Sequence, residues 1–375
     1  MISYEFLQVF WWLTLGVMFC IYASTAGYDL AVTMIFPWLK SEDDRRIVLN
    51  TSAPVWDGNN TWIIFIGGLM FVVFPPLYAI SFSGLLAAIY CILWSFFLRP
   101  VGYDYRGKID SHKWKRMWDF LLFISAFIPV FVFGVAASNA FIGFGYQTDP
   151  IFLRTDFNET FWELLSVCGI LGGISSLLML LAHGGIYIAR RTEDTLRALG
   201  KKIHFISTIL FIVAFILMAL FIVIIDGFDY KITANAYDVT AIYQAHGWWT
   251  NLIAHPWKFL GPVCIVIFIL LTLLLNLKNK FALAFWANTG VIFSTIGSTG
   301  LILYPYIFPS YENPQQSLTL WNATPSHYTL ESLFYIAIVC FVIVAIYRLF
   351  GYYTLWHKEK TITKKIYEEN KNHFY

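Results

Sequence analysis

Four aspartates lie at the ends of long apolar runs, where an ionisable side chain could exchange protons. They are Asp29, Asp57, Asp104 and Asp119. Placing a charge in hydrocarbon is costly, so a carboxylate at a membrane segment is a candidate functional group. A group of carboxylates at one membrane face is what an entrance for proton uptake would need. Asp29 is the most deeply embedded of the four, although an aspartate near the end of a span can also simply reach water.

Each of the other three aspartates has a plainer structural interpretation. Asp57 is followed by glycine and could cap the start of a helix. Asp119 could do no more than favour the positive end of a helix dipole. Asp104 lies between Arg99 and Arg106, and an ion pair with either would be structural. The residue types alone leave proton transfer and these structural roles open.

The histidines decide whether this chain could ligate a haem. Of the eight histidines, only His183 and His204 lie in apolar runs. A hairpin could bring these two together around one haem, but histidines in such places more often hydrogen-bond a neighbour. The sequence contains no P-loop, HExxH, GxSxG or cysteine-based metal motif. We therefore expect no catalytic residue and no metal site in this chain, and treat the two histidines as weak haem candidates.

Membrane helices must position these residues. Of 375 residues, 58% are hydrophobic and 13% are charged, whereas a soluble chain is about 45–50% apolar and about 25% charged. Too few polar side chains remain to cover a water-soluble globule. We therefore predict an all-α polytopic membrane protein, with a single integral membrane domain over residues 1–375. The formal net charge of +2 gives no indication of nucleic-acid binding.

Nine apolar runs are long enough to cross a bilayer, which takes about 20 helical residues. Pro75 and Pro76 separate the second and third runs and should break the helix, because proline lacks an amide donor. If the helix continued through them, the count would be eight. The nine predicted spans are 6–38, 57–75, 77–98, 119–142, 161–189, 203–226, 257–277, 281–305 and 329–350.

Basic residues predict the orientation, because short cytoplasmic loops are enriched in lysine and arginine. With nine spans and a periplasmic N-terminus, 22 of the 25 basic residues fall on the cytoplasmic side, as does the C-terminus. With eight spans the division is 19 to 6, and the C-terminus is still cytoplasmic. The charges therefore favour nine spans and place all four aspartates on the cytoplasmic side.

Several segments resemble subunit II of cytochrome bd-type quinol oxidases, and the likeness runs from Met1 to the cytoplasmic tail. The two most specific are Ala-Pro-Val-Trp-Asp-Gly-Asn at 53–59 and Arg-Pro-Val-Gly-Tyr-Asp-Tyr-Arg at 99–106. Further similar segments are Thr25–Asp29, Trp114–Asp119 and Ser317–Thr324.

The resemblance implies a bacterial inner-membrane oxidase of two large subunits, often with a small single-helix third one. Such a complex couples quinol oxidation to reduction of O2 to water, and takes its protons from the cytoplasm, so that a proton motive force builds without pumping. Two b haems and one d haem would be ligated by subunit I. Subunit II would form two four-helix bundles plus a peripheral helix, surrounded by membrane lipids. It would ligate no haem, although it could hold a structurally bound quinone.

The resemblance also implies roles for individual residues. Asp29, Asp57 and Asp104 match aspartate motifs of the family and are candidates for proton intake. Trp56 precedes Asp57 in a motif near the subunit interface, and Trp62 could border an O2 path there.

Two positions depart from the family pattern. Ala26 stands where many members have an aspartate. A proton route that needs a carboxylate at position 26 as well as Asp29 is therefore not expected from the resemblance alone. Asn322 replaces a common acidic residue of the outer loop. Asparagine can still hydrogen-bond there, but it cannot hold a charge.

Three functions fit the composition and topology alone. They are the oxidase subunit, an independent secondary transporter for protons or a small solute, and a structural membrane anchor. The resemblance favours the first. An absorption spectrum of the chain purified with its native partners would separate them, because only the oxidase would show haem bands.

Overall fold

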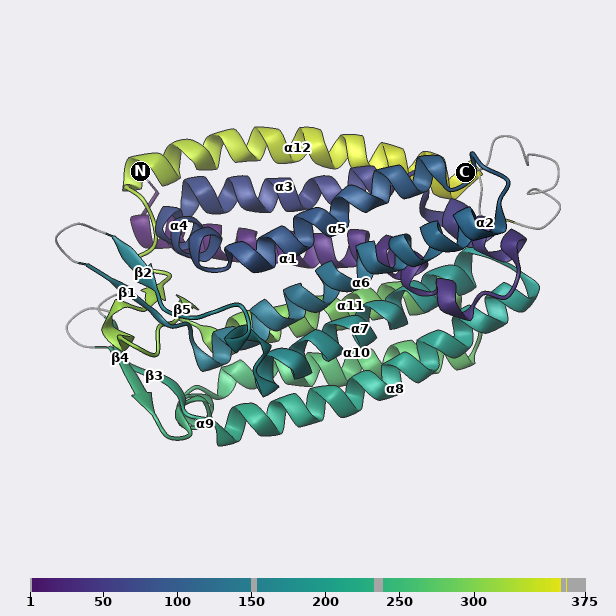
Figure 1. Ribbon diagram of the computed structural model, residues 1–375. Coiled ribbons are helices and arrows are strands. Elements are labelled where there is room, and N and C mark those ends of the chain that lie inside the picture. The colour runs from purple at the N-terminus through teal and green to yellow at the C-terminus, as the bar shows by residue number, and fades with distance from the viewer. Residues whose placement is uncertain (1, 150–153, 233–238, 359–361, 363–375) are drawn as a thin grey trace.

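The computed structural model describes residues 2–149, 154–232, 239–358 and 362. Long helices run side by side along most of the molecule, and short strands gather at one end (Figure 1). The helices are α1 (Tyr4–Met34), α2 (Glu42–Ser52), α3 (Trp56–Val73), α4 (Pro75–Gly84), α5 (Leu86–Tyr105), α6 (His112–Ile142), α7 (Val167–Arg191), α8 (Asp194–Ile224), α9 (Gly247–Ala254), α10 (Leu260–Leu277), α11 (Phe281–Leu303) and α12 (His327–Lys358). Three antiparallel pairs are formed by β1 (Tyr146–Thr148) with β2 (Thr155–Phe157), β3 (Gly227–Ile232) with β4 (Val239–Gln244), and β5 (Tyr306–Phe308) with β6 (Leu318–Thr319).

Eight helices in the described part of the chain are long and apolar enough to cross a membrane. They are α1, α5, α6, α7, α8, α10, α11 and α12. The predicted span 57–75 is also helical, as α3, and runs beside them (Figure 1). Its first turns contain Asp57, Asn59 and Asn60, and it is not one of the eight. The chain is therefore a multi-pass helical membrane protein.

The helix breaks at the proline pair, as predicted. Helix α3 ends at Val73, Phe74 leaves helical geometry, and α4 begins at Pro75. Proline is well accommodated in a first helical turn, where its missing N–H would have no partner. The predicted span 77–98 is divided between α4 and α5 around Leu85. The predicted span 161–189 starts too early, because α7 begins only at Val167.

An additional helix, α2, lies in the connecting segment 40–56. The Ser41 side chain accepts a hydrogen bond from the Asp44 amide (3.0 Å) and caps its N-terminus. Acidic residues occupy its first turn, where they favour the helix dipole. Its buried residues, Ile47 to Ser52, pack against α1 and α7. This amphipathic helix closes one end of the bundle.

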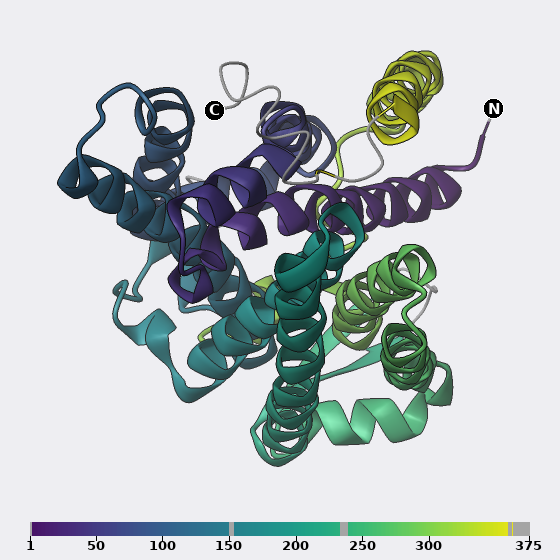
Figure 2. The same cartoon turned by 90° about the vertical axis from the view of Figure 1, so that its right-hand side faces the viewer.

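Helix α1 lies at the centre of the molecule. It packs against α3, α6, α7, α11 and α12. Figure 2, which looks along the helices, shows α3, α5 and α6 on one side of α1, and α8, α10 and α11 on the other. Helix α12 is peripheral, since no residue of its most apolar stretch is buried.

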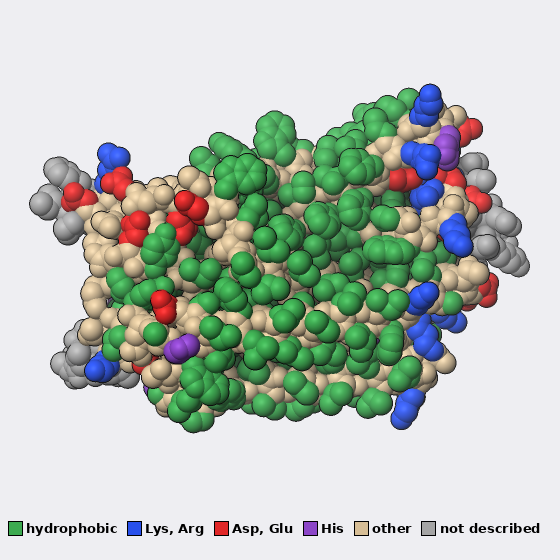
Figure 3. Space-filling view, turned by 60° about the horizontal axis from the view of Figure 1, so that its bottom comes forward, with side chains coloured by type: hydrophobic (Ala, Val, Ile, Leu, Met, Phe, Trp, Pro, Cys, Tyr) green, Lys and Arg blue, Asp and Glu red, His purple; other side chains and the backbone are tan. Residues whose placement is uncertain are grey.

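The two ends of the bundle differ in charge. Lys and Arg side chains gather at the end of the bundle where α12 finishes, and a broad apolar belt separates that end from the strands (Figures 1 and 3). This basic end is the one that the sequence predicts to be cytoplasmic. The tail lysines counted in that prediction, Lys360, Lys364, Lys365 and Lys371, lie outside the described residues.

The strands and α9 form a cap over the opposite end. The Trp248 indole donates to the carbonyl of Phe141 (2.7 Å), and the Tyr306 hydroxyl donates to the carbonyl of Asp229 (2.7 Å). The fully buried Lys258 ammonium donates to two backbone carbonyls at the C-terminal end of α11, where a cation is favoured by the helix dipole. The Trp248 and Lys258 contacts fix the cap to α6 and α11, and the Tyr306 contact joins two strands within the cap.

Two glycines allow α7 and α8 to approach closely. A Cβ on Gly185 would lie 2.6 Å from the His204 amide nitrogen, and a Cβ on Gly200 would lie 2.6 Å from the Gly185 carbonyl oxygen. Both obstacles are backbone atoms, which cannot rotate away. Only glycine therefore fits at this helix crossing.

Replacing Gly185 by alanine should destabilise the fold, because the added Cβ would push α7 away from α8. Overpacking of this kind typically costs about 1–3 kcal/mol. The matched control is Gly297→Ala in α11, where a Cβ meets nothing within 4 Å and alanine should strengthen the helix slightly. Thermal unfolding of the purified variants measures the difference. A Gly185→Ala protein as stable as the control would contradict the close packing.

Candidate functional site

A fully buried ion pair joins α1 to α5. The Nη2 atom of Arg99 lies 2.8 Å from Oδ1 of Asp29, and the two side chains are 1% and 0% exposed. A charge buried alone is strongly unfavourable, so removing either partner leaves the other uncompensated. Asp29, the aspartate that the sequence marks as most deeply embedded, is therefore held by an arginine 70 residues away.

Helix α3 supplies the partner of the second carboxylate oxygen. Asn59 Nδ2 donates to Asp29 Oδ2 (3.0 Å), and also to the Thr25 carbonyl (3.1 Å) and the Tyr28 hydroxyl (3.2 Å). The Asn59 amide oxygen accepts a hydrogen bond from the Tyr352 hydroxyl of α12 (2.5 Å). A single amide side chain thus links α1, α3 and α12 around the carboxylate.

Aromatic rings enclose the arginine. The Arg99 guanidinium lies 5.9 Å from the ring centroid of Trp56 and 5.7 Å from that of Tyr103, and these two rings stack with centroids 5.0 Å apart. Cation–π attraction to such rings strengthens when the cation is desolvated. Among the described residues, Nε and Nη1 of Arg99 have no hydrogen-bond partner, so the ring faces provide much of their environment.

Asp57 and Asp104 lie at the same end of the bundle but are exposed. Asp57 is in the first turn of α3 and Asp104 in the last turn of α5. The proposed cap by Asp57 is wrong, because Val55 occupies the cap position and Asp57 is already helical. Its charge still favours the N-terminal end of the helix dipole.

Asp104 does not form the predicted ion pair with a flanking arginine. Arg99 is bound to Asp29, and Arg106 donates to Glu42 (2.9 Å) and to Asp119 (2.6 Å). Within the described residues, no ion pair includes Asp104. Its carboxylate therefore remains open to solvent.

Asp119 does not act at a helix N-terminus. Helix α6 begins at His112, about two turns earlier, and the dipole effect falls off within the first turn. The Asp119 carboxylate instead receives Arg106 and lies 3.6 Å from Nε of Arg45. It ties α6 to α2 and α5, which is a structural role.

Trp62 is covered by α12. The Arg348 guanidinium lies 5.5 Å from the ring centroid of Trp62, and the indole is only 8% exposed. The guanidinium of Arg348 also lies against Gly58, because a Cβ added to Gly58 would be 2.5 Å from its Nη1 atom. These contacts pack α12 onto α3. The O2 path along Trp62 stays a prediction.

The two membrane histidines do not fit the geometry of haem ligands. His183 Nε2 donates to the Ser24 carbonyl (3.0 Å), and its Nδ1 lies 3.1 Å from the amide of Asn288. His204 Nδ1 donates to the Ala182 carbonyl (2.9 Å), and its Nε2 lies 3.3 Å from the Thr272 hydroxyl. Both rings are buried with each nitrogen engaged, so neither presents a nitrogen to an iron.

The two departures from the family pattern fall in different settings. Ala26 is fully buried in α1, in the apolar core. The Asn322 amide oxygen accepts from the Thr319 amide (2.7 Å), and its nitrogen donates to the Ser317 carbonyl (3.1 Å). Asn322 therefore organises the outer turn through neutral hydrogen bonds.

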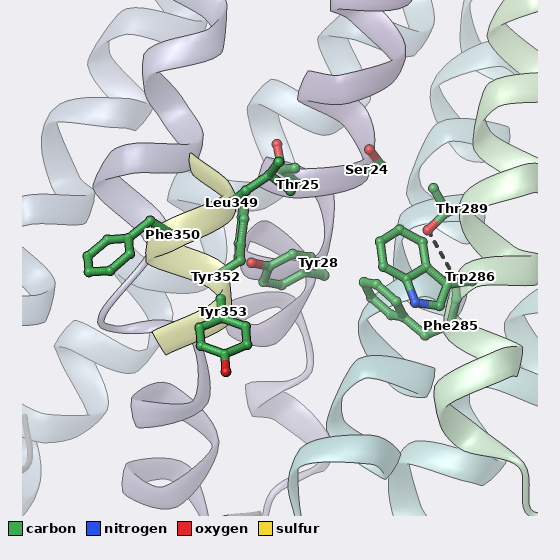
Figure 4. A pocket seen from close by; sticks show the side chains of 10 residues that line it. All are labelled: Ser24, Thr25, Tyr28, Phe285, Trp286, Thr289, Leu349, Phe350, Tyr352 and Tyr353. Atoms are coloured by element: carbon green, nitrogen blue, oxygen red, sulfur yellow. Dashed lines mark hydrogen bonds between the residues drawn. The ribbon is translucent and has the colours of Figure 1, made fainter. Parts of the chain in front are cut away.

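A groove of about 610 Å3 opens beside the buried network, between α1, α11 and α12 (Figure 4). Tyr28 and Tyr352, whose hydroxyls both reach Asn59, form part of its wall. Phe285 and Trp286 of α11 face them from the opposite side (Figure 4). Seven of the ten lining residues are aromatic or leucine, and the other three are Ser24, Thr25 and Thr289.

The family model for cytochrome bd terminal oxidase subunit II matches residues 7–355. The chain belongs to this family. Cytochrome bd-I ubiquinol oxidase subunit 2 of Escherichia coli (strain K12) is 34% identical over 383 residues, which cover both chains fully. Cytochrome bd ubiquinol oxidase subunit 2 of Bacillus subtilis is 27% identical over 355 residues, which cover 93% of this chain and 97% of the relative. The structure of the bd oxidase from Geobacillus thermodenitrificans shares the fold, with a TM-score of 0.68 at 16% identity over 92% of this chain and 98% of that one.

Membership in the family confirms the resemblance found in the sequence. The chain is a multi-pass subunit of the bacterial inner membrane, in the respiratory cytochrome bd oxidase family. The family implies a quinol oxidase complex that contains haem and pairs subunit II with a subunit I. Within the described residues, no group of three or more His, Cys, Asp or Glu side chains could hold a metal ion.

The sequence paired Arg99 with the wrong aspartate, and it did not single out Asn59 or Tyr352. Arg99 and Asn59 lie inside the two most specific motifs, where a polar residue next to an apolar run was a usable signal. Tyr352 carried no such signal, because tyrosines are common at the ends of membrane helices. Its role depends on α12 returning to α3.

Replacing Arg99 by glutamine should destabilise the assembled complex, because Asp29 would be left buried without a counter-charge. Breaking a buried pair in this way costs about 3–5 kcal/mol. The double variant Asp29→Asn/Arg99→Gln leaves no unpaired buried charge at this position and should recover much of the loss. Thermal unfolding of the purified complexes tests this. A double variant less stable than Arg99→Gln alone would show that the ion pair is not the main constraint.

Proposed function

We propose that this chain is the non-haem-ligating subunit II of an oxidase that couples quinol oxidation to the reduction of O2 to water. Two b haems and a d haem would be ligated by subunit I, which this chain supports. The family match over residues 7–355 carries the proposal. The hydrogen bonds at His183 and His204 favour haem ligation outside this chain. A small third subunit and a quinone bound within this chain stay predictions.

The proposed topology has nine spans, a periplasmic N-terminus and a cytoplasmic C-terminus. The grouping of Lys and Arg at the C-terminal end of the bundle supports this orientation (Figure 3), because basic residues favour the cytoplasmic side. The contacts of α1, α3, α5 and α6, and those of α7, α8, α10 and α11, support two four-helix bundles with α12 at the periphery.

The surface of α3 supports a contact with subunit I near Trp56 and Trp62. Ile64 and Phe71 are 72% and 60% exposed. Such side chains can face either lipid or a second membrane subunit. The Trp62 indole itself is covered within this chain by the Arg348 guanidinium.

Proton intake is the proposed contribution of this chain to the reaction, and would generate a proton motive force without pumping. Asp57 and Asp104 are exposed at the basic end, where they can exchange protons with the cytoplasm. Asp29 is the buried carboxylate beyond them, and Asn59 connects it to the hydroxyls of Tyr28 and Tyr352. Proton passage there would use the Asp29 carboxylate and the two tyrosine hydroxyls that Asn59 joins to it as successive hydrogen-bonding groups.

The assembled complex tests the oxidase assignment. Purified with its native partners, the chain should show absorption bands of haem b and haem d and should support quinol-driven O2 uptake. Histidine variants that keep the fold, such as His204→Gln, should leave all haem bands in place. A colourless chain that moves a solute across vesicles would instead identify a transporter.

The proton route is tested by Asp57→Asn and Asp29→Asn in the complex. A relay role predicts that quinol oxidase activity falls at least about tenfold, a barrier change of about 1.4 kcal/mol, while haem content is kept. Asp110→Asn is the control, because Asp110 is a fully exposed carboxylate at the same membrane face. Unchanged activity and haem in the first two variants would exclude the relay. Loss of haem would show a structural role instead.

A further inference from the structure

Two adjacent hollows follow helix α11 at the basic end of the molecule. The first is the groove of Figure 4, here called the α11 groove, and its α11 residues are Phe285, Trp286 and Thr289. The second, here called the basic hollow, measures about 430 Å3 and is lined by Arg190 of α7, and by Asn279, Lys280 and residues 281–283 around the start of α11.

The two hollows lie on one face of α11. Phe281 and Ala282 of the basic hollow precede Phe285 and Trp286 of the α11 groove by four residues each, and residues four apart share a helix face. Arg190 joins the two, because it lines the basic hollow while its guanidinium lies 5.6 Å from the ring centroid of Phe285. A single elongated molecule could therefore occupy both.

The basic hollow lies in a positively charged part of the surface. The ends of α7, α8, α10 and α11 that meet there carry seven basic residues, Arg190, Arg191, Arg197, Lys201, Lys202, Lys278 and Lys280. Glu193 and Asp194 are the two acidic residues in the same segments. Lys201 donates to Asn279 (2.8 Å) and so brings another ammonium to the rim. This excess of positive charge complements an anion.

The α11 groove has the opposite character. Trp286 is 56% exposed and Tyr353 62% exposed, so its two walls border the lipid-facing surface of α11 and α12. Its volume falls within the range of about 300–1,000 Å3 that is usual for small-molecule sites. A hydrocarbon chain fits such a lining, since burying each CH2 group contributes about 0.8 kcal/mol.

We propose that the basic hollow and the α11 groove together bind one anionic phospholipid of the cytoplasmic leaflet. Its phosphate contacts Arg190 and Lys280, and one acyl chain follows α11 into the groove. Basic pockets between membrane helices on the cytoplasmic side are suited to anionic headgroups. The acyl chain of the lipid would fill the space between α11 and the peripheral helix α12. The inference rests on the proposed orientation but not on oxidase activity.

Native mass spectrometry of the purified complex, titrated with phosphatidylglycerol or phosphatidylcholine, tests the headgroup site. Arg190→Gln/Lys280→Gln should weaken binding of the most tightly held phosphatidylglycerol about tenfold and leave phosphatidylcholine binding unchanged. Lys108→Gln/Lys113→Gln is the matched control, because it removes two exposed charges from the same membrane face elsewhere. Equal phosphatidylglycerol binding in the two double variants would overturn the proposal.

A second variant tests the groove without changing charge. Thr289→Trp would fill the α11 groove and should weaken retention of phosphatidylglycerol, whereas Leu271→Trp on the exposed surface of α10 should not. Haem content and subunit composition of each complex establish that it is assembled. Unchanged phosphatidylglycerol retention in an assembled Thr289→Trp complex would overturn the acyl-chain position. Recovery of a neutral prenyl quinone in place of the lipid would do the same.

Discussion

A carboxylate and a guanidinium that meet between membrane helices must remain paired, and much of the molecule is arranged around the pair of Asp29 and Arg99. Neither group can reach water, because both side chains are essentially unexposed. In such surroundings each charge needs its counter-charge and further polar contacts. Asn59 supplies one to the carboxylate, and the rings of Trp56 and Tyr103 enclose the guanidinium. Helices α1, α3 and α5 are thereby held in one relative position.

The same end of the bundle contains a second, more exposed ionic network. Arg106 joins Glu42 of α2 to Asp119 of α6, so the connecting segments are fastened to the helices by charge. At the opposite end Lys258 is held by carbonyl oxygens and an amide instead of a carboxylate. The two membrane faces are therefore built differently. At the basic end paired charges fasten the helices, whereas at the opposite end the Lys258 ammonium is held by uncharged acceptors beneath a small cap.

Helix α12 connects the buried network to the lipid. It is peripheral, yet Tyr352 reaches Asn59 and Arg348 covers Trp62. The groove between α12 and α11 lies directly beside these contacts. The proposed phospholipid would therefore support the helix whose tyrosine completes the environment of Asp29. The lipid composition of the membrane would then affect the proposed proton route through the packing of α12.

The sequence by itself determined the membrane class, the helix break at Pro75, the family and the deep position of Asp29, because these depend on composition and on local motifs. The sequence did not determine which charged residues pair with each other. Arg99 was assigned by proximity to Asp104, but in the fold it turns to Asp29, since a buried arginine must find a carboxylate equally removed from water. The helix start at His112 likewise changed the role of Asp119. Only the tertiary structure decided which charges meet, because ion pairs and grooves between helices depend on distances that neighbouring residues do not encode.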